Sequence, residues 1–304
     1  METLEDIKWV DTHCHLQLMG DEINEEDISN LEYFIIPGVD VPSSLKAKEF
    51  SLTYPEKSYW SAGLHPHEAD SLEDIKNELQ VLMEEADLIG ETGLDYYRNL
   101  SSKENQIMNF EFHIDVSKEL NKPLIVHCRD SFSDVFDTLS SKNTSNPIIL
   151  HSWTGGNKWT KKFIELGVYF SISGIVTYDT AHDLQAAVKN IPIDKILLET
   201  DVPYLAPQPF KGKRNNPTYI QYTGAKLAVN RFDTDNTNIN QFNVYSDAST
   251  FHGSLTTSSG VIISQTRTPL ASSPCSVGHI AWDTSYLYVC TASNTWKRIT
   301  LSSF

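Results

Sequence analysis

The feature that most constrains the fold of this chain is a repeating pattern of short apolar runs. Eight short apolar runs rich in β-branched and aromatic residues recur about every 20–35 residues through the first 232 positions, and polar, amphipathic stretches separate them. The predicted strands are IKWVDTH, YFIIPGV, SYWSAGL, DLIGETG, PLIVHC, PIILHS, VYFSISG and KILLETD. The clearest predicted helices are SLEDIKNELQVLMEEA, with Ser71 as its N-cap, and NQIMNFEFHIDVSKELN. Eight strands alternating with helices predict an α/β fold, a closed (β/α)8 TIM barrel.

Metal-binding residue types follow these strands. Functional groups of such barrels gather at the carboxyl ends of the strands, and residues i and i+2 of an extended chain share one side. Each histidine alone is more simply a hydrogen-bonded core residue, but the set as a whole is hard to ascribe to packing. The six ligand-type residues are His13, His15, Glu91, His127, His151 and Asp201. Four imidazoles and two carboxylates suit a two-metal centre in which one carboxylate bridges.

These motifs resemble a known family. The stretches VDTHCHL, AGLHPHEA, IGETGLDYYR, PLIVHCRD, ILHSWTGG and LLETDVPYLAPQPFKGKRNNPTYI occur in order between about residues 7 and 230. They are similar to the motifs of TatD-type metal-dependent deoxyribonucleases, a branch of the amidohydrolase-like TIM barrels. The resemblance implies hydrolysis of DNA phosphodiester bonds in DNA degradation or repair, commonly as a 3′–5′ exonuclease with divalent metal. Mg²⁺ or Mn²⁺ is the ion that the family implies, whereas four imidazoles also suit Zn²⁺.

The resemblance also assigns roles at the matching positions. It implies that His13 and His15 hold one ion with Glu91 and Asp201, and that Glu91 bridges to a second ion. It implies that His127 and His151 complete the second set of ligands. Glu91, Asp201 and His65 are then the catalytic residues. The sequence does not separate Asp201 as ligand from Asp201 as proton acceptor, and His65 contacts either the scissile phosphate or a metal-bound water.

Neighbours of these residues have two readings each. His67 either joins the site or stabilises its loop, Asp11 is expected beside the ligands rather than among them, and Asp95 is expected to orient its loop or a ligand. Tyr96 and Tyr97 either stack on a terminal base or pack the loop.

Contacts to DNA are predicted from the cations near the strand ends. The net charge of −16 argues against a surface that tracks phosphates generally. Arg129 is predicted either to clamp a phosphate or to form a salt bridge with a rim acid. Lys211, Lys213 and Arg214 form a basic cluster soon after Asp201, which is either a contact to the nucleic-acid backbone or a solvated loop.

Composition changes near Phe232. Residues 233–304 contain no glutamate, four aspartates and three basic residues, and Ser, Thr and Asn dominate. We therefore predict a barrel at 1–231, a linker at 232–250 and a small β-rich module at 251–304, in place of the last helices of the family. The module resembles short β-rich modules at the ends of virus structural and tail-associated proteins, which implies a virion or other protein partner. Trp153 stands where the family usually has phenylalanine, at the expected rim of a pocket.

The cellular compartment is predicted from the lack of targeting and membrane-spanning segments. No signal-like segment or apolar run of membrane-spanning length is apparent, so we expect a soluble protein of the cytoplasm, or of the host cytoplasm if the gene is viral. Cys14 and Cys128 are expected to be reduced, while Cys275 and Cys290 would pair only in an oxidising compartment.

Two other functions compete with the nuclease. One is a binuclear hydrolase of another substrate. The GKRN stretch at residues 212–215 argues against it, because its cations favour a phosphate-containing substrate. The other is a viral structural or accessory protein carrying a degraded barrel, against which the six intact ligand positions argue.

Overall fold

The computed structural model describes residues 8–20, 23–232, 280–282, 285–293 and 295–300. The chain divides into two compact units, residues 1–246 and 247–304. Nearly all of the predicted linker and the first part of the predicted module, up to residue 279, lie outside the described residues. So do Cys275 and the side chain of Cys290.

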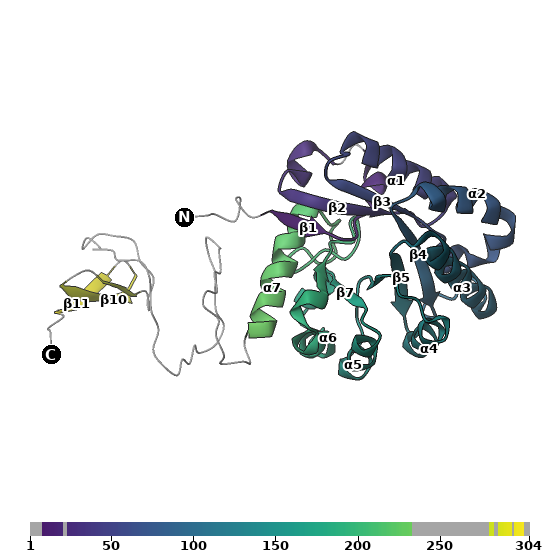
Figure 1. The fold of residues 1–304 in the computed structure, drawn as a ribbon. Coiled ribbons are helices and arrows are strands. Elements are labelled where there is room, and N and C mark those ends of the chain that lie inside the picture. The colour runs from purple at the N-terminus through teal and green to yellow at the C-terminus, as the bar shows by residue number, and fades with distance from the viewer. Residues whose placement is uncertain (1–7, 21–22, 233–279, 283–284, 294, 301–304) are drawn as a thin grey trace. The chain divides into compact units, whose positions relative to one another are not determined.

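The first unit contains an eight-stranded barrel whose strands follow chain order, each parallel to the next (Figure 1). The strands are β1 (Trp9–Asp11), β2 (Leu31–Pro37), β3 (Ser58–Ala62), β4 (Leu88–Asp95), β5 (Leu124–Arg129), β6 (Ile148–Leu150), β7 (Tyr169–Ile172) and β8 (Ile196–Leu198). Just beyond β1, the Thr12 N–H donates to the Leu198 carbonyl at 2.9 Å, and the Asp201 N–H donates to the His13 carbonyl at 2.8 Å. These bonds close the barrel, so all eight predicted strands and the predicted TIM-barrel class are confirmed.

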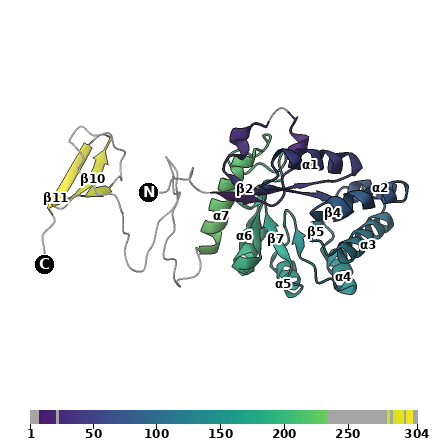
Figure 2. The ribbon, with the colours of Figure 1, turned by 45° about the horizontal axis from the view of Figure 1, so that its top comes forward.

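Helices surround the strands (Figure 2). They are α1 (Val41–Thr53), α2 (Leu72–Glu85), α3 (Lys103–Leu120), α4 (Phe132–Lys142), α5 (Asn157–Glu165), α6 (His182–Ala187) and α7 (Ile220–Phe232). Both helices predicted explicitly are confirmed as α2 and α3. Ser71 does precede α2, but its hydroxyl donates to the Glu68 carbonyl at 2.8 Å and caps no helical N–H. Ser71 therefore occupies the predicted N-cap position without a capping hydrogen bond, because a 3-10 helix, Pro66–Ser71, runs directly into α2.

Helix α7 covers the seam between the first and last strands. A Cβ atom on Gly224 would lie 2.5 Å from the Trp9 ring and 3.3 Å from a Leu198 methyl group, so glycine permits this close approach. Leu227 of the same helix is buried. The apolar outer faces of β1 and β8 are therefore covered by α7, the last helix among the described residues.

The barrel interior and its outer layer form separate apolar clusters. Leu88, Ile125 and Ile149 cluster with three partly buried residues of other strands, Ile35, Tyr169 and Leu197. Six strands each contribute one residue to this inner layer, as expected where side chains converge on a barrel axis.

Trp153 belongs to the packing between β7 and α5 rather than to a pocket rim, so its predicted location was wrong. The side chain is 1% exposed, and its ring centroid lies 5.2 Å from that of Phe163 and 5.3 Å from that of Phe170. Its indole N–H donates to the Thr160 hydroxyl at 2.9 Å, which satisfies the one polar atom of a buried tryptophan.

The second unit contains a three-stranded antiparallel sheet in the order β9 (Ile280–Trp282), β10 (Tyr286–Ala292) and β11 (Thr295–Thr300). A small antiparallel sheet was predicted for these residues and is confirmed.

Cys14 and Cys128 are buried free thiols, as predicted. Within the ranges that the structure describes, none of the helices has the length and apolarity needed to span a bilayer.

Candidate metal centre

The six predicted ligand residues converge at the carboxyl end of the barrel in two groups. The first group joins His13 Nε2, His15 Nε2, Glu91 Oε2 and Asp201 Oδ1. The two imidazole nitrogens lie 3.2 Å apart, and each lies 3.2–3.7 Å from both carboxylate oxygens. Donor atoms around a divalent ion with bonds of about 2.0–2.2 Å lie about 3.0–3.6 Å apart, so the observed separations are close to those of ligands to one ion.

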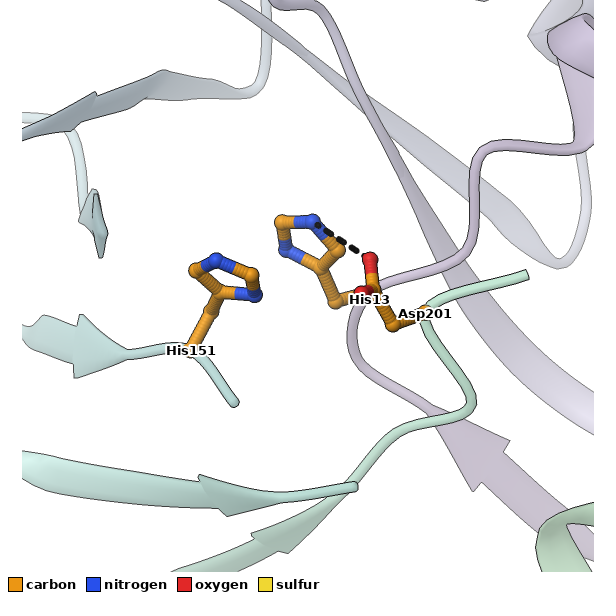
Figure 3. Close-up of side chains that lie close together, drawn as sticks. All are labelled: His13, His151 and Asp201. Carbon is orange, nitrogen blue, oxygen red and sulfur yellow. Dashed lines mark ion pairs between the residues drawn. The ribbon is translucent and has the colours of Figure 1, made fainter. Parts of the chain in front are cut away.

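The second group uses the other oxygen of Glu91. Glu91 Oε1 lies 3.2 Å from His127 Nδ1 and 2.9 Å from His151 Nε2, and these two nitrogens are 3.1 Å apart. One carboxylate thus has an oxygen in each group, which is the geometry of a bridging ligand. The two groups meet closely: the rings of His13 and His151 stack with centroids 4.0 Å apart and Asp201 beside them (Figure 3).

Local backbone geometry sets the position of Glu91 and Asp201. Gly90 has a φ of 119°, and a Cβ there would lie 2.5 Å from the Ile125 carbonyl oxygen. Only glycine allows β4 to approach β5 this closely immediately before Glu91. Asp201 has a left-handed φ of 59°, which aspartate adopts more readily than most residues. The Asp201 N–H also donates to the His13 carbonyl. This bond joins the segment after β8 to the segment after β1.

In His15 and His127, a hydrogen bond at one ring nitrogen determines that the other nitrogen carries a lone pair able to bind metal. His15 Nδ1 lies 3.2 Å from the Pro37 carbonyl and therefore carries a proton, which leaves a lone pair on Nε2. His127 Nε2 lies 3.2 Å from Asp95 Oδ2 and leaves a lone pair on Nδ1. That lone pair faces Glu91 Oε1, so two acceptors oppose each other at 3.2 Å. A cation between them resolves this repulsion, and the donor set therefore fits a metal.

Burial controls the charge of these groups. It lowers the pKa of His13, and it lowers the pKa of His15 to about 3, so both rings are neutral and able to bind an ion. Burial also acts to raise the pKa of Glu91, but the surrounding imidazoles, His151 foremost, outweigh it and hold that pKa well below its usual value. Burial and the nearby Glu199 carboxylate raise the pKa of Asp201 well above its usual value. A bound divalent cation is the charge that would ionise Asp201.

His65 is placed as a hydrogen-bond donor at this centre. Its Nδ1 accepts the His67 N–H at 3.1 Å, and burial lowers the pKa of the ring to about 4. The neutral ring therefore carries its proton on Nε2, which lies 3.4 Å from Glu91 Oε1. In this tautomer the Nε2–H donates to an oxygen at the centre and does not bind a metal.

Three neighbours have supporting contacts. His67 Nε2 pairs with Asp95 Oδ2 at 2.9 Å, and Asp95 Oδ1 accepts the N–H groups of Tyr97 and Arg98, each at 2.9 Å. Asp95 thus orients both its own loop and His127, as expected. Asp11 is fully buried and accepts bonds from the Thr200 hydroxyl, the Thr200 N–H and the His13 N–H rather than joining either ligand group.

A cavity of about 720 Å³ opens over the two groups. Its lining includes Arg98 and Arg129, together with Tyr204, which is 54% exposed and whose ring lies edge-on to His15. The Arg129 guanidinium lies 3.9 Å from the ring centroid of Tyr97, and no ion pair among the described residues involves it. The predicted salt bridge of Arg129 is therefore not formed within the described part of the chain.

The predicted basic cluster does not line this cavity, and one of its members, Arg214, contacts a lining residue. The Lys211 ammonium sits 4.2 Å from the ring centroid of Tyr178, and Lys213 is exposed. Arg214 donates to the carbonyl of Leu18, a lining residue, at 3.4 Å. Of the two predicted tyrosines, Tyr96 donates to Asp134 at 2.7 Å and packs its loop, whereas Tyr97 is 60% exposed.

Sequence reasoning missed three residues near the centre: Arg98, Glu199 and Tyr204. The motif letters offered a signal for two of them, since Arg98 ends IGETGLDYYR and Glu199 precedes Asp201 by two positions in LLETD. Residues two apart in an extended segment share a side, so Glu199 should have been considered with Asp201.

Comparison with known proteins identifies relatives of this chain. The model of the TatD-related DNase family matches residues 10–241. YcfH of Escherichia coli (strain K12), an uncharacterized metal-dependent hydrolase, is 34% identical over 231 residues, which cover 72% of this chain and 87% of YcfH. YabD of Bacillus subtilis (strain 168), described in the same terms, is 34% identical over 230 residues, covering 72% of this chain and 89% of YabD. The crystal structure of YJJV, a TatD homolog from E. coli K12, superposes with a TM-score of 0.67 at 23% identity, covering 73% of this chain and 90% of YJJV, and shows the same fold.

Proposed function

Because this chain belongs to the TatD-related DNase family and is a metal-dependent hydrolase, we propose that it cleaves DNA phosphodiester bonds, as a 3′–5′ exodeoxyribonuclease. The observation that carries this proposal is the shared carboxylate of Glu91, with one oxygen in each of two ligand groups beneath an arginine-lined cavity. His13, His15 and Asp201 would hold one ion, His127 and His151 the other, and Glu91 both. Two divalent ions, Mg²⁺ or Mn²⁺, would supply an activated water and stabilise the attacking and leaving oxygens.

The protein's own groups then orient the phosphate and move protons. His65 presents Nε2–H toward Glu91 Oε1 and would donate to a non-bridging oxygen of the scissile phosphate. Asp201 is buried at the inner wall of the cavity, so it would both bind its ion and accept the proton of the attacking water.

Arg98 and Arg129 support a phosphate substrate. Both line the cavity, and Arg129 is the last residue of β5, the strand that carries His127. A guanidinium that stacks on Tyr97 keeps its N–H edge available for a phosphate. We assign these two arginines to the phosphates nearest the cleaved bond, and the cluster of Lys211, Lys213 and Arg214 to more distant phosphates of a single strand.

The strong negative charge supports action on DNA ends rather than along duplex DNA. With a net charge of −16, the surface cannot neutralise many phosphates at once. A substrate held by two ions and two arginines at one cavity needs few further contacts, and a single-stranded 3′ end meets this requirement.

The proposal is tested with a single-stranded oligonucleotide labelled at its 5′ end, with Mg²⁺ or Mn²⁺ and with EDTA. We expect a ladder of products shortened stepwise from the 3′ end, which requires metal and disappears in Glu91→Ala. Glu119→Ala is the matched control because Glu119 is an exposed glutamate on α3. Folded, metal-loaded wild type that leaves the oligonucleotide intact would contradict the nuclease and direct attention to other hydrolysable substrates.

A further inference from the structure

Two imidazoles at the centre lack the supporting contact that the others have. His15 is supported by the Pro37 carbonyl and His127 by the Asp95 carboxylate. In contrast, the Nδ1 atoms of His13 and His151 are buried and have no hydrogen-bond partner among the described residues. An imidazole that binds metal through Nε2 carries its proton on Nδ1 and needs an acceptor there.

A buried carboxylate, that of Glu199, lies next to the His151 nitrogen. Glu199 is 0% exposed, and neither of its oxygens has a hydrogen-bond partner within the described ranges. Its Oε1 lies 3.5 Å from His151 Nδ1, slightly beyond hydrogen-bond length. A buried carboxylate without hydrogen bonds is costly, and Glu199 offers two acceptor oxygens beside His151, whose ring stacks on that of His13.

The stacking of the two rings explains how one carboxylate can serve both. His13 and His151 are nearly parallel, with 15° between their planes and centroids 4.0 Å apart (Figure 3). An acceptor at the edge of one ring is therefore close to the edge of the other. The Glu199 backbone is fixed by its N–H, which donates to the Ile172 carbonyl of β7 at 3.1 Å.

We propose that Glu199 is a positioning residue whose two oxygens accept the Nδ1–H groups of His151 and His13. One buried carboxylate would then align one imidazole of each ligand group from its Nδ1 side. Glu91, by contrast, has an oxygen within each group. This inference rests on the proposed metal centre but not on the proposed substrate. It assigns to Glu199 a role in holding both ions, not in touching the phosphate.

The test is calorimetric titration of the metal-free full chain with Mn²⁺, without DNA. Glu199→Gln keeps the size of the side chain but replaces one acceptor oxygen with an NH₂ donor. We expect Mn²⁺ affinity to fall about 10–100-fold, the usual effect of removing a partner of a metal-bound histidine. Glu119→Gln is the matched control: it makes the same change at an exposed glutamate of α3, so Mn²⁺ affinity should be unchanged. Wild-type affinity in folded Glu199→Gln would overturn the proposal.

A second measurement decides the question if Glu199→Gln does not fold. In wild type labelled with ¹⁵N-histidine and loaded with diamagnetic Zn²⁺, the Nδ1–H groups of His13 and His151 should be visible and slow to exchange with solvent. Their rapid exchange would overturn the role of Glu199. Because neither readout involves DNA, failure here is distinct from failure of the nuclease proposal.

Discussion

Replacing His113 with glutamine should remove a pH-dependent part of the stability. His113 is 0% exposed; its Nδ1–H donates to the Asn109 carbonyl at 2.7 Å, and its Nε2 accepts the Leu64 N–H at 2.9 Å. Both contacts require the neutral ring, and burial lowers its pKa to about 4 from 6.5. Since the folded-state pKa lies below the unfolded one, protons favour the unfolded chain. The stabilisation is therefore complete above pH 6.5 and is lost as the pH falls toward 4.

The magnitude follows from the size of the shift. At about pH 5 the unfolded histidine is protonated and the folded one is not, which costs about 2 kcal/mol at about 1.4 kcal/mol per pH unit. Urea denaturation of wild type and His113→Gln, both in EDTA, measures the free energy of unfolding at each pH. We expect the advantage of wild type over the variant to shrink by about 2 kcal/mol between about pH 7.5 and 5. An advantage that stays constant would refute the reasoning.

Three further predictions concern other contacts. Asp95→Asn removes an acceptor from the His127 ring, so calorimetry should show Mn²⁺ binding to the second group weakened about 10–100-fold; unchanged binding would mean that the ring needs no such support. Arg129→Ala should raise the KM for an oligonucleotide about tenfold or more, in keeping with a charged hydrogen bond of about 1.5–3 kcal/mol, whereas exposed Lys46→Ala should leave KM unchanged. Equal KM values would exclude the arginine from phosphate binding. Trp153→Phe should lower the free energy of unfolding by about 1–3 kcal/mol in urea without changing cleavage, because it loses a buried hydrogen bond and volume; no loss would show that the pocket repacks.

The sequence was sufficient for the barrel and for the place of the ligands. Each strand is a distinct apolar run, and in a closed parallel barrel all strands end at the same face. The ligand types at those ends therefore had to meet, which is why His13 and His151 are neighbours although they lie far apart in the chain.

The supporting contacts could not be predicted in the same way. Asp95 accepts the ring N–H groups of His67 and His127, which lie 28 and 32 positions away, and these contacts depend on tertiary structure. Lys211 was expected at the cavity because it follows Asp201 closely, but its ammonium lies over the ring of Tyr178. Trp153 follows a ligand by two positions, yet the extra ring is used for packing against α5.

The most direct test of the central claim, a two-ion centre bridged by Glu91, is a crystal structure of the Mn²⁺-loaded protein with anomalous data at the manganese edge. We predict two peaks about 3.5–4 Å apart, one on each side of the Glu91 carboxylate. The first should lie among His13, His15 and Asp201, and the second between His127 and His151. A single peak, or two peaks without Glu91 between them, would contradict the account.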